Sequence, residues 1–124
     1  MNVVDSSGWL EYFAGGPNAE FFAPAIEDVD DLVVPTISIY EVFKRVLQQT
    51  GESEALRAVG FMHLGEVVDL TSTIAIHAAK LSAELKIPMA DSIMLASSQE
   101  QGATLWTQDA DLRGLEGVEF TPKA

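Results

Sequence analysis

The chain has 124 residues, 48% of them hydrophobic, which is enough for one domain with an apolar core, and no stretch approaches the roughly 18 apolar residues of a membrane-spanning helix. It contains no cysteine and two histidines, which excludes disulfides, cysteine nucleophiles and metal sites rich in thiolate or imidazole. The net charge of −12 opposes nucleic-acid binding by electrostatics alone, because such binding needs lysines and arginines to neutralise phosphates.

The first half of the chain is predicted to form two strands and four helices. Short apolar, β-branched runs alternate there with segments whose apolar residues recur at helical spacing. In chain order we expect a strand over 2–4, a helix capped by Ser6 or Ser7 and running to Phe13, a helix over 20–27, a strand over 32–35, and helices over 38–49 and 52–64. On the last helix, Leu56, Val59 and Met62 are expected to share the buried face.

The second half continues the alternation. We expect a strand over 66–70, a helix capped by Thr71 or Ser72 and running to Leu85, a helix over 90–101, a strand over 104–106 and a further strand over 117–120. Strands that alternate with helices and are apolar on both faces predict a parallel sheet covered on both sides. No linker or repeat interrupts the pattern, so we expect one three-layer α/β/α domain with four or five strands.

Acidic residues stand where the strands of this sheet end. In open parallel sheets, ligands bind beyond the carboxyl ends of the strands. Asp5 follows the first strand, Asp109 and Asp111 follow the strand over 104–106, and Glu41 and Asp91 lie in the first turns of two helices. We expect four acids to meet at one edge of the sheet, with Asp109 favoured over Asp111 for the last place.

Each acid also has a structural explanation when it is taken alone. Ser38 and Glu41 fit a capping box, and Glu41 can pair with Arg45 four residues later. Asp91 suits the positive end of a helix dipole, Asp5 can be an N-cap, and the acids after the late strand can be turn residues. Their joint position favours a metal site, because clustered carboxylates repel one another unless a divalent cation lies between them.

Oxygen donors without cysteine predict a hard cation, Mg²⁺ or Mn²⁺, whose coordination is completed by water and substrate phosphate. Such an ion lowers the pKa of a bound water, orients it and offsets charge on a phosphate. The pattern therefore predicts phosphodiester hydrolysis, with one or two ions.

Four motifs occur in a characteristic order and spacing across nearly the whole chain. They are Val4-Asp5-Ser6-Ser7, Ile39-Tyr40-Glu41-Val42, Pro88-Met89-Ala90-Asp91-Ser92-Ile93 and Thr107-Gln108-Asp109-Ala110-Asp111-Leu112. With them the chain resembles the PIN-domain ribonucleases and looks like a VapC-type toxin of a toxin–antitoxin pair, which implies a PIN-like α/β/α sandwich. Leu112 stands where a phenylalanine is common, a difference that affects packing and not the acidic residues.

The resemblance implies roles for seven positions. The metal-binding acids correspond to Asp5, Glu41, Asp91 and Asp109. Beside them are a hydroxyl residue, Thr107, a further acid that some members use, Asp111, and a hydroxyl that helps to hold water or phosphate, Ser6.

The resemblance also implies a single-strand-specific endoribonuclease that forms dimers and is inhibited by a small antitoxin. A basic or aromatic antitoxin side chain in the acidic site would fit the charge of −12, and so would acids clustered around cations or an acidic surface that keeps the protein soluble. Lys44, Arg45 and Arg113 flank the motifs and are candidate contacts to RNA or antitoxin, with surface ion pairs as the alternative. Because no signal-peptide pattern begins the chain, we expect a cytoplasmic protein without membrane attachment.

Two other functions fit part of the pattern. A phosphoacceptor receiver domain shares the length and an acid after the third strand, Asp69, but it needs an acidic pair after the first strand and a late lysine. Here Asp5 is followed by Ser6-Ser7, and no lysine lies between Lys86 and Lys123. A catalytically inactive PIN-like binding module would keep the fold without the chemistry, and the intact acids oppose it.

Overall fold

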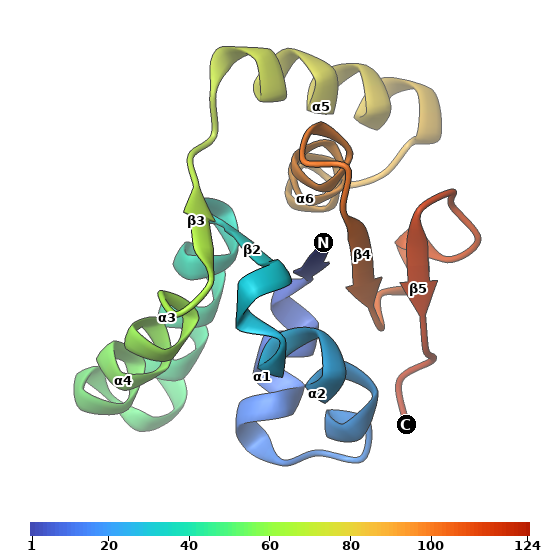
Figure 1. The fold of residues 1–124 in the computed structure, drawn as a ribbon. Coiled ribbons are helices and arrows are strands. Elements are labelled where there is room, and N and C mark those ends of the chain that lie inside the picture. Colours follow the sequence, from blue (N-terminus) through green and yellow to red (C-terminus); the bar gives the residue numbers. More distant parts are fainter.

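The computed structural model describes all 124 residues and has a five-stranded parallel sheet at its centre (Figure 1). The strands are β1 (Asn2–Val4), β2 (Leu32–Pro35), β3 (Glu66–Val68), β4 (Thr104–Thr107) and β5 (Val118–Phe120). Their order is β3-β2-β1-β4-β5, and every pair is parallel. The chain thus moves outward from β1 to β3 and then returns to the other side of β1, so that the strand order reverses between β1 and β4.

Six helices and two 3₁₀ turns connect the strands. They are α1 (Ser6–Ala14), α2 (Ala19–Glu27), η1 (Val29–Asp31), α3 (Thr36–Thr50), α4 (Glu52–Met62), α5 (Ser72–Leu85), α6 (Met89–Glu100) and η2 (Ala110–Leu112). Helices α1 to α4 cover one face of the sheet. Helix α6 covers the other face, and α5 packs outside it (Figure 1). None of the six helices has both the length and the apolar character needed to cross a bilayer.

The central strands are buried on both faces because their side chains alternate between two cores. Val4 and Val34 pack with residues of α1 to α4, among them Trp9 and Phe22. Val3, which is opposite Val33 in the parallel register, packs on the other face with residues of α6. The three-layer α/β/α sandwich predicted from the alternation of strands and helices is therefore confirmed.

The starts of α1 and α3 differ from the main sequence prediction, whereas Thr71 caps α5 as predicted. Asp5, which the sequence also allowed as an N-cap, caps α1 in place of Ser6 or Ser7, and its carboxylate accepts the Ser6 N–H at 2.8 Å. Helix α3 begins at Thr36, so Ser38 lies inside it and donates its hydroxyl to the Pro35 carbonyl. The capping box that the sequence allowed for Glu41 does not form.

The buried face of α4 was also predicted wrongly at one position. Leu56 is 57% exposed, whereas Ala55, Ala58 and Met62 are buried. Helix α4 packs along α3, and small alanine side chains let two helices approach closely. The larger Leu56 consequently lies on the outer face.

Candidate metal centre

Three carboxylates from separate parts of the chain meet at the carboxyl edge of the sheet. Asp5 directly follows β1, Asp109 follows β4 after one intervening residue, and Asp91 lies in the first turn of α6. One carboxylate oxygen from each lies within 4.8 Å of the other two. Asp5 is only 5% exposed and Asp91 only 8%, so water screens the charges poorly. The cluster occupies the point where the strand order reverses, which is the usual ligand site of such sheets.

Asp5 is held in a single orientation by hydrogen bonds from its surroundings. Its Oδ1 accepts the Ser6 N–H at 2.8 Å, and its Oδ2 accepts the hydroxyls of Ser7 at 3.1 Å and Thr107 at 2.8 Å. The buried Thr107 hydroxyl in turn accepts the Asp109 N–H at 2.9 Å. Thr107 therefore links the ends of β1 and β4 and sets the spacing between two of the acids.

The electrostatics of the cluster favour a bound cation. Burial, followed by the charges of Asp109 and Asp5, raises the pKa of Asp91 to about 8. Burial also raises the pKa of Asp5, although its three hydrogen bonds act in the opposite direction. The buried acids thus resist full ionisation on their own, and a divalent cation relieves both the burial penalty and the mutual repulsion. Closely spaced oxygen donors without nitrogen or sulfur fit Mg²⁺ or Mn²⁺.

Glu41 and Asp111 are near the cluster but outside the group of three. The Glu41 carboxylate projects from α3 into an open cavity that lies over the three aspartates, and it accepts the Ser6 hydroxyl at 2.7 Å. It forms no ion pair with Arg45. Asp111 is exposed, and its backbone N–H donates to Asp109 Oδ1 at 2.9 Å. The geometry places Asp109, and not Asp111, in the cluster.

An open cavity of about 430 Å³ lies over the three aspartates. Its lining consists of Asp5, Ser6, Ser7, Leu10, Tyr40, Glu41, Lys44, Arg45, Gln48, Asp91 and Asp109. Lys44 and Arg45, which were candidate contacts to RNA or antitoxin, line this cavity, whereas Arg113, the third candidate, does not. Asp69, the acid that the receiver-domain alternative would use, is exposed after β3 and belongs neither to the cluster nor to the lining of the cavity.

Four residues that line the cavity were not predicted from the sequence: Ser7, Leu10, Tyr40 and Gln48. Tyr40 and Gln48 are on α3, four residues to either side of Lys44, so the helical repeat puts all three on one ridge. That spacing was the available signal, and the exposure of the ridge became evident only from the packing of α3.

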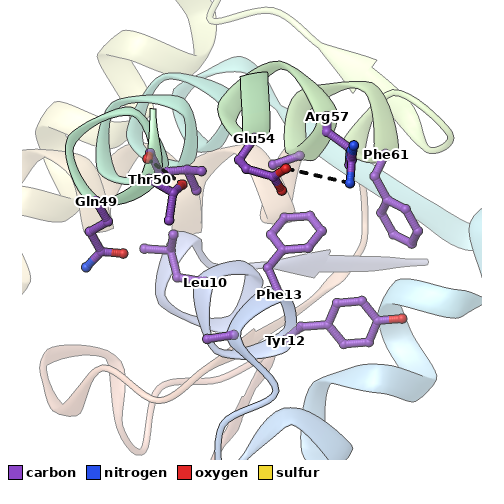
Figure 2. A pocket seen from close by; sticks show the side chains of 11 residues that line it. Leu10, Tyr12, Phe13, Gln49, Thr50, Glu54, Arg57 and Phe61 are labelled. Atoms are coloured by element: carbon purple, nitrogen blue, oxygen red, sulfur yellow. Dashed lines mark hydrogen bonds and ion pairs between the residues drawn. The ribbon is translucent and has the colours of Figure 1, made fainter. Parts of the chain in front are cut away.

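A larger, apolar groove of about 610 Å³ lies between α1 and the α3–α4 pair (Figure 2). Its aromatic wall includes Tyr12, Phe13 and Phe61, and the rings of Phe13 and Phe61 meet edge to face with centroids 5.7 Å apart. Figure 2 shows Arg57 and Glu54 paired at the α4 side, with an N–O distance of 3.6 Å. The groove is separate from the acidic cavity except that Leu10 lines both.

A comparison with protein families gives a match to the model described as PIN domain over residues 3–118. The chain belongs to the PIN-domain family. The match spans all the motifs singled out from the sequence, and it excludes the receiver-domain alternative.

Solved structures resemble this PIN domain along almost its whole length. A toxin–antitoxin complex from Klebsiella pneumoniae contains a chain with 22% identity and a TM-score of 0.79, with 96% of each chain covered. DNA-bound VapBC from Salmonella typhimurium has 17% identity and a TM-score of 0.74, covering 98% of this chain and 97% of that chain. VapC20 from Mycobacterium tuberculosis, described as a toxin that cleaves the sarcin-ricin loop, has 16% identity and a TM-score of 0.73, covering 90% and 92%.

At these identities the likeness establishes the fold, which this PIN domain shares with VapC-type toxins. The comparison with curated proteins gives no match.

Proposed function

We propose that this PIN domain is a divalent-metal-dependent endoribonuclease and the toxin of a toxin–antitoxin pair. The observation that carries the proposal is the cluster of the buried Asp5 and Asp91 with the half-buried Asp109, in which one carboxylate oxygen from each lies within 4.8 Å of the others beneath an open cavity. A site that resists ionisation without a cation and opens to solvent is suited to binding a metal together with a phosphate.

Asp5, Asp91 and Asp109 would hold Mg²⁺ or Mn²⁺, as one ion or two. The bound cation supplies a water of lowered pKa and offsets charge that develops on the phosphate. The chain's own groups keep the carboxylates in place: Thr107 and Ser7 orient Asp5, and the Asp111 N–H orients Asp109. Asp91, whose pKa is raised to about 8 in the metal-free protein, would bind such a cation in its ionised form and so release its proton near neutral pH.

Glu41 has a different role in this proposal. Its carboxylate is fixed by Ser6 Oγ at 2.7 Å and faces the cavity from the α3 side. We assign to Glu41 the orientation of the attacking water and the acceptance of its proton. A general base must lie within reach of that water, and its carboxylate must not be occupied as a metal ligand.

An antitoxin is the second partner in the proposal. The Klebsiella and Salmonella relatives are chains of toxin–antitoxin assemblies, and this chain carries an apolar groove of about 610 Å³ beside its acidic cavity. We assign the groove in Figure 2 to an apolar antitoxin segment, with basic residues of that partner directed to the acidic cavity. A homodimer, which the family resemblance implies, and a cytoplasmic location, which is expected from the lack of a signal-peptide pattern, complete the proposal.

Cleavage of labelled single-stranded RNA with Mn²⁺ or Mg²⁺, and with EDTA as the metal-free condition, tests the enzymatic claim. We expect EDTA to stop cleavage and Asp91→Asn to lower it by more than about 100-fold. Asp69→Asn is the matched control, because Asp69 is an exposed acid at another strand end, and it should cut like the wild type. Cleavage by Asp91→Asn near the wild-type rate would contradict the site.

Calorimetric titration with Mn²⁺ distinguishes the nuclease from the alternative, a catalytically inactive binding module. A metal-dependent enzyme binds the ion and loses binding in Asp91→Asn. A scaffold that merely shares the fold shows no binding in either protein.

A further inference from the structure

Tyr40 is a large aromatic side chain left in solvent at the acidic cavity. It is 63% exposed and lines the cavity from α3. Core packing does not account for it, because the inward positions of α3 are taken by Ser38 and Val42. An aromatic ring that is not needed in the core and faces a charged cavity offers a π-surface to a ligand on the face that Lys44 does not approach.

Two cations accompany this ring and have no acidic partner within the chain. Of the seven basic residues, only Arg57 forms an ion pair, with Glu54. Lys44 and Arg45 also line the cavity, and the Lys44 ammonium lies 5.9 Å from the centroid of the Tyr40 ring. In a chain with 19 acidic residues, two adjacent unpaired cations within an acidic cavity are available to an anionic ligand.

The cavity therefore has two chemically different walls. Asp5, Asp91 and Asp109 form the acidic wall, which is suited to a metal. Helix α3 forms the other wall, where Tyr40, Lys44 and Arg45 line the cavity beside Glu41, whose carboxylate is held by Ser6. Single-stranded nucleic acid is bound in this way elsewhere: cations follow the phosphates while aromatic side chains stack on successive bases. A duplex does not offer a base face for stacking, because its bases are stacked on each other.

We propose that Tyr40 stacks on one nucleobase beside the bond to be cut, with Lys44 and Arg45 on neighbouring phosphates, so that this wall of the cavity selects single-stranded RNA. The inference rests on the proposed nuclease function and adds the residue that determines strand selectivity. Tyr40 is a substrate-binding residue and takes no part in the chemistry at the metal.

The test measures kcat/KM on a labelled single-stranded RNA for Tyr40→Phe, Tyr40→Leu and Tyr40→Ala. Base stacking on an aromatic residue corresponds to a loss of roughly 5- to 150-fold on removal, so Tyr40→Ala and Tyr40→Leu should lose about 10-fold or more, chiefly in KM. Tyr40→Phe keeps the ring and should stay within about 2-fold of the wild type. Ile76→Ala on α5, 62% exposed and away from the cavity, is the control for loss of an exposed apolar side chain.

A second substrate separates stacking from a general effect on the fold. With an RNA of the same length in which one base at a time is replaced by a stable abasic unit, the wild type should lose activity at one position. At that position Tyr40→Ala should lose nothing further, since the stacked pair is already absent. Equal losses for Tyr40→Ala on every substrate, or no loss on any, would overturn the proposal.

Binding measured by fluorescence anisotropy in Ca²⁺ distinguishes failure of this inference from failure of the nuclease function. RNA binding that depends on Tyr40 without any cleavage in Mn²⁺ would contradict the nuclease and uphold the stacking. Equal RNA cleavage by the wild type and by Tyr40→Ala would support the nuclease function and contradict the stacking. Weaker antitoxin binding by Tyr40→Ala with unchanged RNA cleavage would identify a protein contact and also overturn the stacking.

Discussion

The Thr107 hydroxyl joins two acids of the candidate metal centre, donating to Asp5 Oδ2 at 2.8 Å and accepting the Asp109 N–H at 2.9 Å. Because it is fully buried, no water replaces either hydrogen bond when the hydroxyl is removed. We expect Thr107→Val, which preserves shape, to lower the free energy of unfolding by about 1–3 kcal/mol and the Mn²⁺ affinity by about 10- to 100-fold.

Urea unfolding and calorimetric titration measure these two effects. Thr107→Ser restores the hydroxyl and should recover most of the metal affinity. Thr104→Val, also on β4 but outside the network, is the control. Wild-type Mn²⁺ affinity in Thr107→Val would show that the hydroxyl does not position the acids.

The stability of the metal-free protein should fall as the pH rises from about 4 to about 8 through the contribution of Asp91. The pKa of its carboxyl is raised from 3.8 to about 8 in the folded protein, so between these values the folded state retains a proton that the unfolded state has lost. Raising the pH therefore favours unfolding. We expect Asp91→Asn, measured in EDTA, to be more stable than the wild type at pH 8.5, with a smaller difference at pH 5.

Other acids of the chain also respond to pH, so the difference between wild type and variant is the informative quantity. Denaturant midpoints at both pH values provide it. A difference that is constant with pH, or that grows toward acid, would contradict a proton retained at Asp91.

Binding of Mn²⁺ near pH 7 should release about one proton, because the cation replaces the one held by the cluster. Titration calorimetry in two buffers with different ionisation enthalpies gives the number of protons released. The number should approach zero at pH 9.5, where Asp91 is already ionised. Release that is unchanged at the higher pH would indicate a different proton source.

Glu41→Gln should separate water orientation from metal binding. Glu41 lies outside the group of three acids and is held by Ser6, so we expect RNA cleavage to fall by about 100-fold, within the range of a lost general base. The Mn²⁺ affinity should fall much less than in Asp91→Asn. Parallel losses in both measurements would place Glu41 among the metal ligands instead.

Phe61→Ala tests the antitoxin groove. Phe61 packs against Phe13 in the aromatic wall of the groove and does not line the acidic cavity. With the proposed antitoxin as the probe, we expect complex formation to weaken by about 10-fold or more, as for an aromatic anchor at an interface, while RNA cleavage is retained. Ile76→Ala, at an exposed position on α5 that lines neither cavity, is the control for complex formation.

The fold and three of the four favoured acids follow from local sequence patterns and one topological rule. Parallel strands all end at one edge of a sheet, so acids that follow strands were expected there. The acids after β1 and β4 are neighbours because these two strands pair, an order that the sequence pattern did not predict. Asp91 was found through a helix start and not a strand end, and it reaches the cluster because α6 begins at the same edge of the sheet. These inferences depend on where strands end and helices begin, which the hydrophobic pattern of the sequence predicts well.

Side-chain environments were predicted less well because they depend on packing between segments far apart in the chain. Ala55 is buried and Leu56 is exposed because α4 packs closely against α3. The exposure of Tyr40 and the raised pKa of Asp91 likewise arise from neighbours that no local pattern specifies. Ser38 and Glu41 satisfied a capping motif that the early start of α3 left unused.

Helix α1 has an acid of the candidate metal centre at one end and an apolar contact surface along its side. Asp5 is its N-cap, Leu10 lines both cavities, and Tyr12 and Phe13 face the groove. A molecule bound in the groove also restrains the helix whose N-cap carboxylate belongs to the candidate metal centre. Coupling of this kind is reciprocal. If occupancy of the groove changes the Mn²⁺ affinity by some factor, Mn²⁺ changes the affinity of the groove by the same factor, so the metal concentration would regulate how tightly the proposed antitoxin binds.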